Sequence, residues 1–181
     1  MFMLIFNYLN MKTLLFFFLF LLALPAHSQS LNKNLKTNIT NEGMMYYIYD
    51  LKTKSICDDT QPLEYDFTYL DSRNDVAFTA TCITTNITNI DSFYIAFPSG
   101  EKLACDVEKI YTERKSKWHT RFRVNLDYNF WVGMYSLNTP FEIILTCKNK
   151  KQIIFKDSMK AWKKNKKKLS LIQEMIDANR N

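Results

Sequence analysis

The stretch that decides the fold is FYIAFPSGEKLACDV, residues 93–107. Apolar residues fill every second position on both sides of a turn at residues 98–101, PSGE. Alternation with a period of two is typical of a β-strand with one buried face. Two such runs around a turn rich in Pro, Ser and Gly predict an antiparallel hairpin.

Similar alternating segments extend outward from this hairpin on both sides. They lie at residues 45–49, 64–69, 76–84, 118–124, 141–147 and 152–156. The chain is rich in Tyr and Phe, which favour strands, and has only three glycines. The pattern predicts a mainly β fold over residues 45–157: an antiparallel two-layer β-sandwich, immunoglobulin-like in general architecture.

A register for these strands follows if neighbours in the chain pair and keep their apolar sides together. The pairings predicted in this way are Cys82 with Phe93, Ile95 with Cys105, and Cys105 with Val124. The same register places Arg123 opposite Asp106 and Arg121 opposite Glu108. The sequence thus predicts a meander whose basic strand at residues 117–123 is neutralised by its neighbour.

The C-terminal segment predicts a helix over residues 158–178, with Asp157 and Ser158 as N-cap residues. Its apolar residues fall on one helical stripe, which Asn165 interrupts. The stripe consists of Trp162, Leu169, Ile172 and Ile176. This arrangement is typical of an amphipathic helix.

Positive charge is concentrated in the same segment. Residues 29–147 hold 12 Lys and Arg against 15 Asp and Glu, a net charge of −3, whereas residues 148–181 hold 11 against 3, a net charge of +8. The candidate anion-contact residues are Lys160, Lys163, Lys164, Lys167 and Lys168. Two interpretations stay open: a docking element for an anionic membrane, glycan or nucleic acid, or a packing helix whose lysines keep it soluble.

The N-terminus has the three regions of a secretory signal. Lys12 is followed by an apolar run of 11 residues from Leu14 to Leu24, then by Pro25 and the small-x-small triplet at residues 26–28. The run is too short for a membrane span, which needs about 20 apolar residues. We expect the signal peptide to lie within residues 1–28. Translation is expected to start at Met11, and cleavage is expected near Ser28. A flexible lead-in over residues 29–44 is expected to follow.

The four cysteines, Cys57, Cys82, Cys105 and Cys147, predict disulfides, because an even number in an exported chain favours pairing. In the predicted meander Cys82 and Cys105 lie two strands apart, roughly 9–10 Å, which is too far for a bridge. Two connectivities remain. They are Cys57–Cys82 with Cys105–Cys147, which we prefer, and Cys57–Cys105 with Cys82–Cys147.

Catalytic motifs are lacking. His119 is the one histidine downstream of the predicted cleavage point, so a multi-histidine metal site is excluded there. The glycines are too few and too scattered for a phosphate-binding loop, and no cofactor is predicted. The aromatic connection at residues 127–140 is either a plug for the core or a binding surface. The candidates for that surface are Tyr128, Phe130, Trp131 and Tyr135.

The segment at the N-terminus resembles the export signals of bacterial envelope proteins. The sequence therefore predicts an exported, non-catalytic protein with a binding or structural role in the periplasm or outside the cell, and with no integral membrane span after cleavage. Its partner is an anionic surface or another envelope protein, reached through the C-terminal helix. An enzyme with an unfamiliar site, built around His119, is the remaining alternative.

Overall fold

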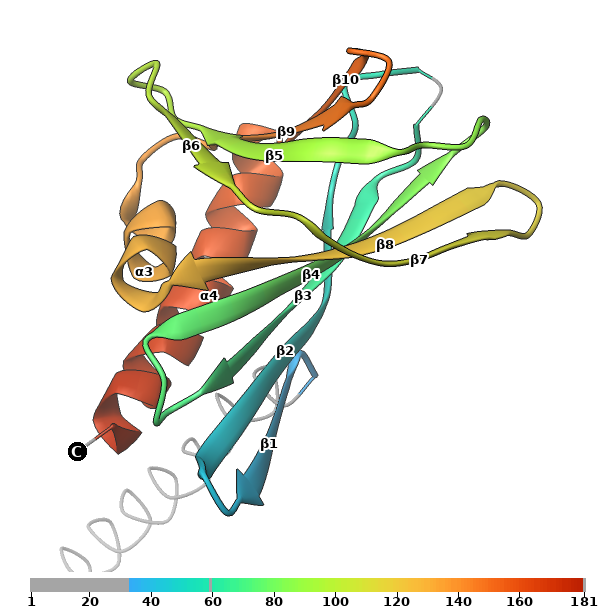
Figure 1. Ribbon diagram of the computed structural model, residues 1–181. Helices are drawn as coiled ribbons and strands as arrows, with labels where there is room; N and C mark the ends of the chain where they lie inside the picture. Colours follow the sequence, from blue (N-terminus) through green and yellow to red (C-terminus); the bar gives the residue numbers. More distant parts are fainter. Residues whose placement is uncertain (1–32, 59, 181) are drawn as a thin grey trace, which may run out of the picture. The chain divides into compact units, whose positions relative to one another are not determined.

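The computed structural model describes residues 33–58 and 60–180, which form two antiparallel sheets and two helices (Figure 1). The predicted mainly β fold with a C-terminal helix is confirmed. The strands are β1 (Leu35–Thr40), β2 (Gly43–Thr53), β3 (Leu63–Leu70), β4 (Asp75–Thr84), β5 (Ile90–Ala96), β6 (Lys102–Cys105), β7 (Glu108–Arg114), β8 (Trp118–Asp127), β9 (Glu142–Cys147) and β10 (Gln152–Lys156). The helices are α3 (Tyr128–Ser136) and α4 (Met159–Asn179).

The chain divides its strands between the two sheets in an order that differs from the chain order. The larger sheet has the order β1-β2-β3-β4-β8-β7, and the smaller one has the order β10-β9-β5-β6. The chain leaves the larger sheet after β4, builds β5 and β6, and returns to it with β7 and β8. The hairpin predicted around residues 98–101 is present as β5–β6, and the alternating segments predicted at residues 141–147 and 152–156 pair as a second hairpin, β9–β10.

The predicted meander over residues 76–124 is wrong. Strand β4 pairs with β8, so that Cys82 lies opposite Thr120, and β5 belongs to the other sheet. The reason is that β4 is a central strand, buried on both faces over most of its length. The apolar side chain of Phe93 still meets β4, but from the opposite sheet: its ring centroid lies 5.4 Å from that of Phe78.

The predicted pairing of Cys105 with Val124 is wrong, because Cys105 lies in β6 of the smaller sheet and Val124 in β8 of the larger one. Arg121 lies opposite Tyr111 and not opposite Glu108, because a bulge interrupts β7 between Lys109 and Tyr111.

For Ile95 and Arg123 the partner is displaced by two residues from the predicted one. Ile95 lies opposite Leu103, two residues from the predicted partner Cys105. Likewise Arg123 lies opposite Glu108, with 3.5 Å between Nη1 and Oε2. A shift of two residues keeps every side chain on its own face, because strand side chains alternate with a period of two. For Ile95 and Arg123 the faces were therefore predicted correctly although the partners were not.

The core is built on the larger sheet and is strongly aromatic. Phe67, Phe78 and Phe122 lie on one face of that sheet, and each is buried. Phe93 of the smaller sheet covers Phe78 and Phe122, with centroid distances of 5.4 and 6.1 Å. Phe67 is covered by Trp131 of α3 at 5.5 Å. Aromatic pairs at such distances add about 0.5–1.5 kcal/mol each beyond the burial of their area.

The N-terminal predictions fall partly outside the described residues. The predicted signal peptide over residues 1–28 lies outside them altogether. Within the predicted lead-in over residues 29–44, the structure places strand β1, which pairs with β2 around a tight turn before Gly43. A Cβ atom at Gly43 would collide with the carboxylate of Asp71, which accepts a hydrogen bond from the Met44 N–H at 3.0 Å.

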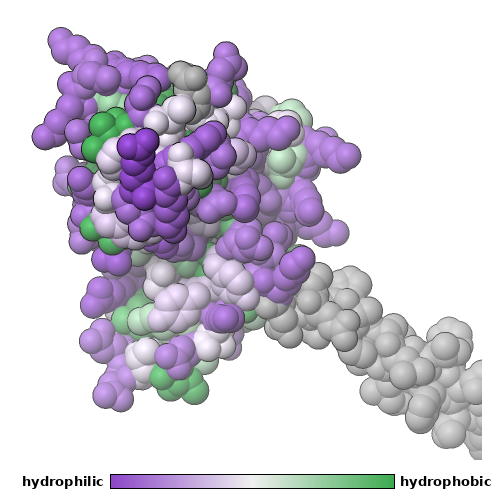
Figure 2. Space-filling model, turned by 90° about the vertical axis from the view of Figure 1, so that its right-hand side faces the viewer, coloured by the Kyte–Doolittle hydropathy of each residue, from purple (hydrophilic) through white to green (hydrophobic). Residues whose placement is uncertain are grey.

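One face of the described part is mainly polar. Figure 2 shows that hydrophilic residues predominate on the face that lies to the right in Figure 1, with only small, separate hydrophobic areas. Within residues 33–58 and 60–180, no helix is both long and apolar enough to cross a membrane.

Candidate functional site

Helix α4 begins and packs as its sequence predicts. The hydroxyl of Ser158 accepts a hydrogen bond from the Ala161 N–H at 3.3 Å, so Ser158 is the N-cap. The whole predicted stripe is buried in the domain, with exposed fractions of 0–2%. It consists of Trp162, Leu169, Ile172 and Ile176. The apolar face of α4 is therefore part of the core.

Three contacts fix α4 against α3 and its surroundings. Trp162 stacks on Tyr135, with 5.5 Å between ring centroids, and meets Phe141 edge-on at 5.3 Å. Near the other end, the hydroxyl of Tyr128 donates a hydrogen bond of 2.7 Å to the Asp177 carboxylate. This carboxylate and burial both raise the pKa of Tyr128, burial having the larger effect. Both ends of the helix are thus anchored, and α4 is held as a rigid element.

Asn165 interrupts the apolar stripe for a structural reason. Its side-chain amide donates a hydrogen bond of 3.0 Å to the carboxylate of Asp157, a residue that is only 9% exposed. A buried carboxylate needs such a donor. The sequence pattern shows the interruption but not its partner, because Asp157 lies eight residues away, just outside the helix.

Four lysines form an exposed surface that we call the lysine face: Lys160, Lys163, Lys164 and Lys167. At 100° per residue they lie on the side of the helix opposite the buried stripe. Each is exposed, and no ion pair joins any of them to a residue in the described ranges. No acidic residue stands in the first turn of α4. The face is a continuous cationic surface on a fixed scaffold.

Two further lysines of α4 differ from these four. Lys168, also predicted as an anion contact, is half-buried at the edge of the lysine face. Lys166 is half-buried too, and its ammonium donates to the carbonyl oxygens of Ser136 and Leu137 at 2.9 and 2.7 Å. These carbonyls end helix α3, where a cation is favoured by the helix dipole. Lys166 is therefore a structural lysine.

The predicted aromatic surface is not formed. Tyr128, Trp131 and Tyr135 are 3%, 0% and 1% exposed, and they line the side of α3 that packs inward. Phe130 is half-buried and contacts Phe97 edge-on at 5.6 Å. Residues 128–136 form a helix, whose N-cap is Asp127, and this places three of the four aromatic side chains in the core. These aromatic residues are a plug for the core.

The predicted disulfides are wrong: all four cysteines, Cys57, Cys82, Cys105 and Cys147, are free. For the preferred pair Cys105–Cys147 the sheet order explains the error. Strand β5 lies between β6 and β9, so the two cysteines stand two strands apart, roughly 9–10 Å. That separation exceeds what a disulfide spans. Burial raises the pKa of the Cys82 thiol to about 12, and Cys147 and Cys57 add to the effect.

His119, Arg121 and Arg123 lie on strand β8, where they face or contact residues of other strands in the same sheet. His119 is half-buried and lies opposite Glu113 in the β7–β8 ladder. Arg121 donates to the Asp66 carboxylate at 2.8 Å and to the Thr81 hydroxyl at 3.0 Å. Together with the Arg123–Glu108 pair, this leaves the strand at residues 117–123 largely neutralised. Among the described residues, no group of three or more His, Cys, Asp or Glu side chains is arranged to hold a metal ion.

Comparisons with protein-family models, with curated proteins and with solved structures find no match to this chain. The lysine face and the surface around it are therefore the features from which a function can be inferred.

Proposed function

We propose that this protein is an exported, non-catalytic binding protein that docks on an anionic membrane surface through the lysine face of α4. The observation that carries the proposal is the lysine face itself: four exposed ammonium groups on one side of a helix whose other side is locked into the core. Export is proposed from the signal-like segment at residues 11–28, and the immunoglobulin-like sandwich from the contact of Phe93 with Phe78 and Phe122 across the sheets.

The placement of the lysines supports a role beyond solubility. Positive charge in the first half of a helix opposes the helix dipole, at about 0.3–1 kcal/mol for a residue near the terminus. Like charges four residues apart, such as Lys160–Lys164 and Lys163–Lys167, cost about 0.2–0.5 kcal/mol per pair. Stability alone would favour acidic residues here. The lysine face therefore lowers the stability of α4 and is nevertheless exposed, as we expect of a docking site for anions.

A lipid surface fits these residues better than a glycan or a nucleic acid. Two large apolar side chains on α4 are exposed beside the lysines, Met159 at 45% and Leu171 at 40%. Leu171 lies one helical turn beyond Lys167 on the same face. Apolar side chains flanked by lysines enter the interfacial layer of a bilayer, where they lose contact with water. The buried stripe excludes deep insertion of α4, so the binding we propose is shallow and reversible.

The strength of the proposed binding can be bounded. A lysine near an anionic bilayer contributes about 1 kcal/mol. Four lysines thus give about 4 kcal/mol, before the contribution of Met159 and Leu171. The electrostatic part weakens as salt is added, because the Debye length falls from about 10 Å at 0.1 M to about 3 Å at 1 M.

The test is a variant in which all four residues of the lysine face are changed: Lys160→Gln, Lys163→Gln, Lys164→Gln and Lys167→Gln. We expect it to lose sedimentation with vesicles that contain phosphatidylglycerol, and to keep or slightly raise its melting temperature because the charge repulsion on α4 is removed. A deletion of α4 is unsuitable, since the helix carries core residues.

The matched control removes the same charge elsewhere, at four exposed lysines outside α4. These are Lys33, Lys54, Lys102 and Lys109, each changed to Gln. The control variant should sediment like the unchanged protein. Equal loss in both variants would mean that net charge alone drives binding, and undiminished sedimentation of the α4 variant would mean that the lysine face is not the docking surface. Either result contradicts the proposal.

A further inference from the structure

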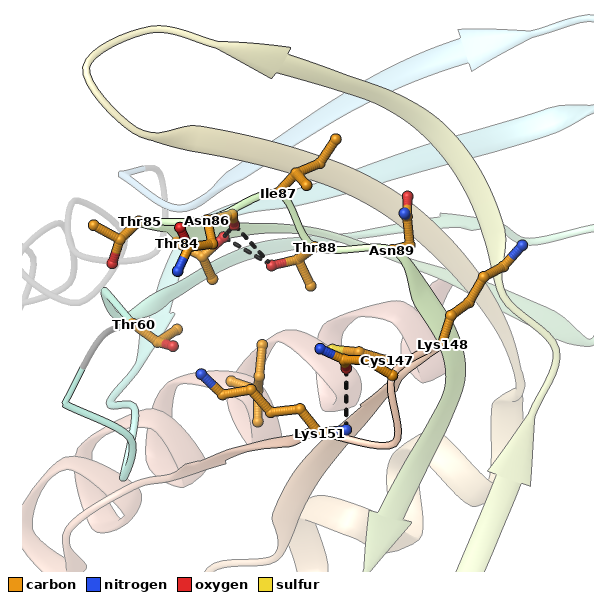
Figure 3. A pocket seen from close by; sticks show the side chains of 12 residues that line it. Thr60, Thr84, Thr85, Asn86, Ile87, Thr88, Asn89, Cys147, Lys148 and Lys151 are labelled. Carbon is orange, nitrogen blue, oxygen red and sulfur yellow. Dashed lines mark hydrogen bonds between the residues drawn. The ribbon is translucent and has the colours of Figure 1, made fainter.

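A polar pocket of about 240 Å³ opens between the loop that joins β4 to β5 and the turn between β9 and β10 (Figure 3). In Figure 3, Thr84, Asn86 and Thr88 lie on one side of the opening, Cys147 and Lys148 on the other, and Thr60 near one end. Two backbone contacts hold these segments together. The Lys148 N–H donates to the Asn89 carbonyl at 3.0 Å, and Thr60 forms a bridge to Thr84. The pocket is thus built by three segments that are far apart in the sequence.

The floor of the pocket offers a hydrogen-bond acceptor. Thr84 and Thr88 are each 6% exposed, and their hydroxyl oxygens lie 2.8 Å apart. The Thr84 hydroxyl donates to the Asn86 carbonyl at 2.7 Å, and the Thr88 hydroxyl lies 3.3 Å from the same carbonyl, so the single proton of Thr88 is shared between that carbonyl and the Thr84 oxygen. A hydroxyl has one proton and two lone pairs. The Thr88 oxygen therefore keeps its lone pairs for a donor in the pocket, such as a ligand hydroxyl.

The rim offers donors and a positive charge. The side-chain amides of Asn86 and Asn89 are exposed and make no hydrogen bond with the described residues. Lys148 is exposed, and none of the ion pairs found in the described ranges involves it. None of the described residues that line the pocket is Asp or Glu. The rim thus favours a ligand that carries a negative charge.

We propose that this pocket binds a single hydroxylated acid of the chemistry of a sugar acid, with several hydroxyl groups and one carboxylate. The carboxylate pairs with the Lys148 ammonium, the amides of Asn86 and Asn89 bind hydroxyl groups, and one ligand hydroxyl donates to Thr88. Pockets for drug-sized ligands have about 300–1,000 Å³ and are mostly apolar. This pocket is smaller and richer in hydroxyl and amide groups, which suits one polar ring rather than a larger apolar ligand.

The experiment is a calorimetric titration of the purified protein with sodium glucuronate, with glucose, and with an oligosaccharide that ends in glucuronate. Glucuronate should bind and glucose should give no measurable heat. Tighter binding of the oligosaccharide would identify the acid as part of a polymer, and equal binding would identify the free acid. Absence of heat with both acids, or equal binding of glucose and glucuronate, would overturn the proposal.

Two variants and a control locate the site. Lys148→Gln should weaken glucuronate binding by at least about tenfold, the lower limit for one hydrogen bond to a charged group, and Asn86→Ala should weaken it too. Lys150 lies in the same turn but outside the pocket lining, so the variant Lys150→Gln should bind glucuronate like the unchanged protein. Unchanged binding by Lys148→Gln would overturn the proposal. The variant that lacks the lysine face should bind glucuronate normally, so this test is independent of membrane docking.

Discussion

At the scale of the residue, the pair formed by Asn165 and Asp157 shows why a polar side chain stands in an apolar stripe. Replacing Asn165 with Ala would leave the buried Asp157 carboxylate without its 3.0 Å donor. A buried polar group left without a partner costs about 1–3 kcal/mol, so we expect Asn165→Ala to lower the free energy of unfolding by that amount. Urea denaturation measures it.

The control for this prediction lies on the same helix. Ser170 is half-buried and its hydroxyl makes no hydrogen bond with the described residues, so Ser170→Ala should change the free energy of unfolding by less than about 0.5 kcal/mol. Equal effects of the two substitutions would show that the Asn165–Asp157 contact contributes nothing specific.

The cysteines give a second prediction at the residue scale. Protein unfolded in denaturant without a reducing agent should show four reactive thiols, because all four cysteines are free. In the folded protein Cys82 and Cys147 are buried, and the pKa of Cys82 is raised to about 12, so these two thiols should react only as the protein unfolds. A thiol count below four in denaturant would restore the disulfides that the sequence predicts.

At the scale of the element, α4 carries two kinds of lysine that a stability measurement separates. Lys166→Gln removes a charged donor from the carbonyls that end α3, and we expect a loss of about 1 kcal/mol in the free energy of unfolding. Lys167→Gln, the adjacent residue on the lysine face, should leave stability unchanged or slightly higher. The reverse order of the two effects in thermal unfolding would contradict these assignments.

The strands show what an alternating pattern of apolar residues predicts about a sheet and what it does not predict. It indicates which side chains share a face, and that part was correct for β5, β6 and β8. It does not distinguish an edge-to-edge neighbour from a strand that packs face to face, because both arrangements bring apolar sides together. For that reason Phe93 was expected beside Cys82, whereas it lies across from Phe78 in the other sheet.

The two helices differ in how well the sequence predicts which of their sides is buried. In α4, a 3.6-residue period over 21 residues predicts both the buried stripe and the lysine face. Helix α3 has only nine residues, nearly all apolar or aromatic, so no polar side marks its orientation. The sequence does not predict the polar pocket, because its residues come from three segments that are far apart in the chain and meet only in the folded protein.

At the scale of the whole molecule, the buried tyrosines predict a loss of stability in alkali. Burial raises the pKa of Tyr65 and Tyr135 above the usual value near 10, and the Asp157 carboxylate adds to it. Above pH 10 the unfolded chain therefore loses tyrosine protons that the folded chain keeps. The free energy of unfolding should fall by roughly 1.4 kcal/mol per pH unit for each of these two residues, and should not change from this cause below about pH 9.

This pH dependence is measured by the urea midpoint at about pH 8 and about pH 11, together with the tyrosinate absorbance of the folded protein. A midpoint that stays constant over that interval, or an absorbance showing that all tyrosines ionise together near pH 10, would show that Tyr65 and Tyr135 are not shielded as the structure has them.

The central claim is that the lysine face docks the whole molecule on an anionic bilayer, and vesicle sedimentation of the purified protein tests it most directly. Vesicles of phosphatidylcholine with phosphatidylglycerol should carry the protein down at low salt. Vesicles of phosphatidylcholine alone should not, and about 1 M salt should release the bound protein. Equal sedimentation with both kinds of vesicle, or none with either, would contradict the claim.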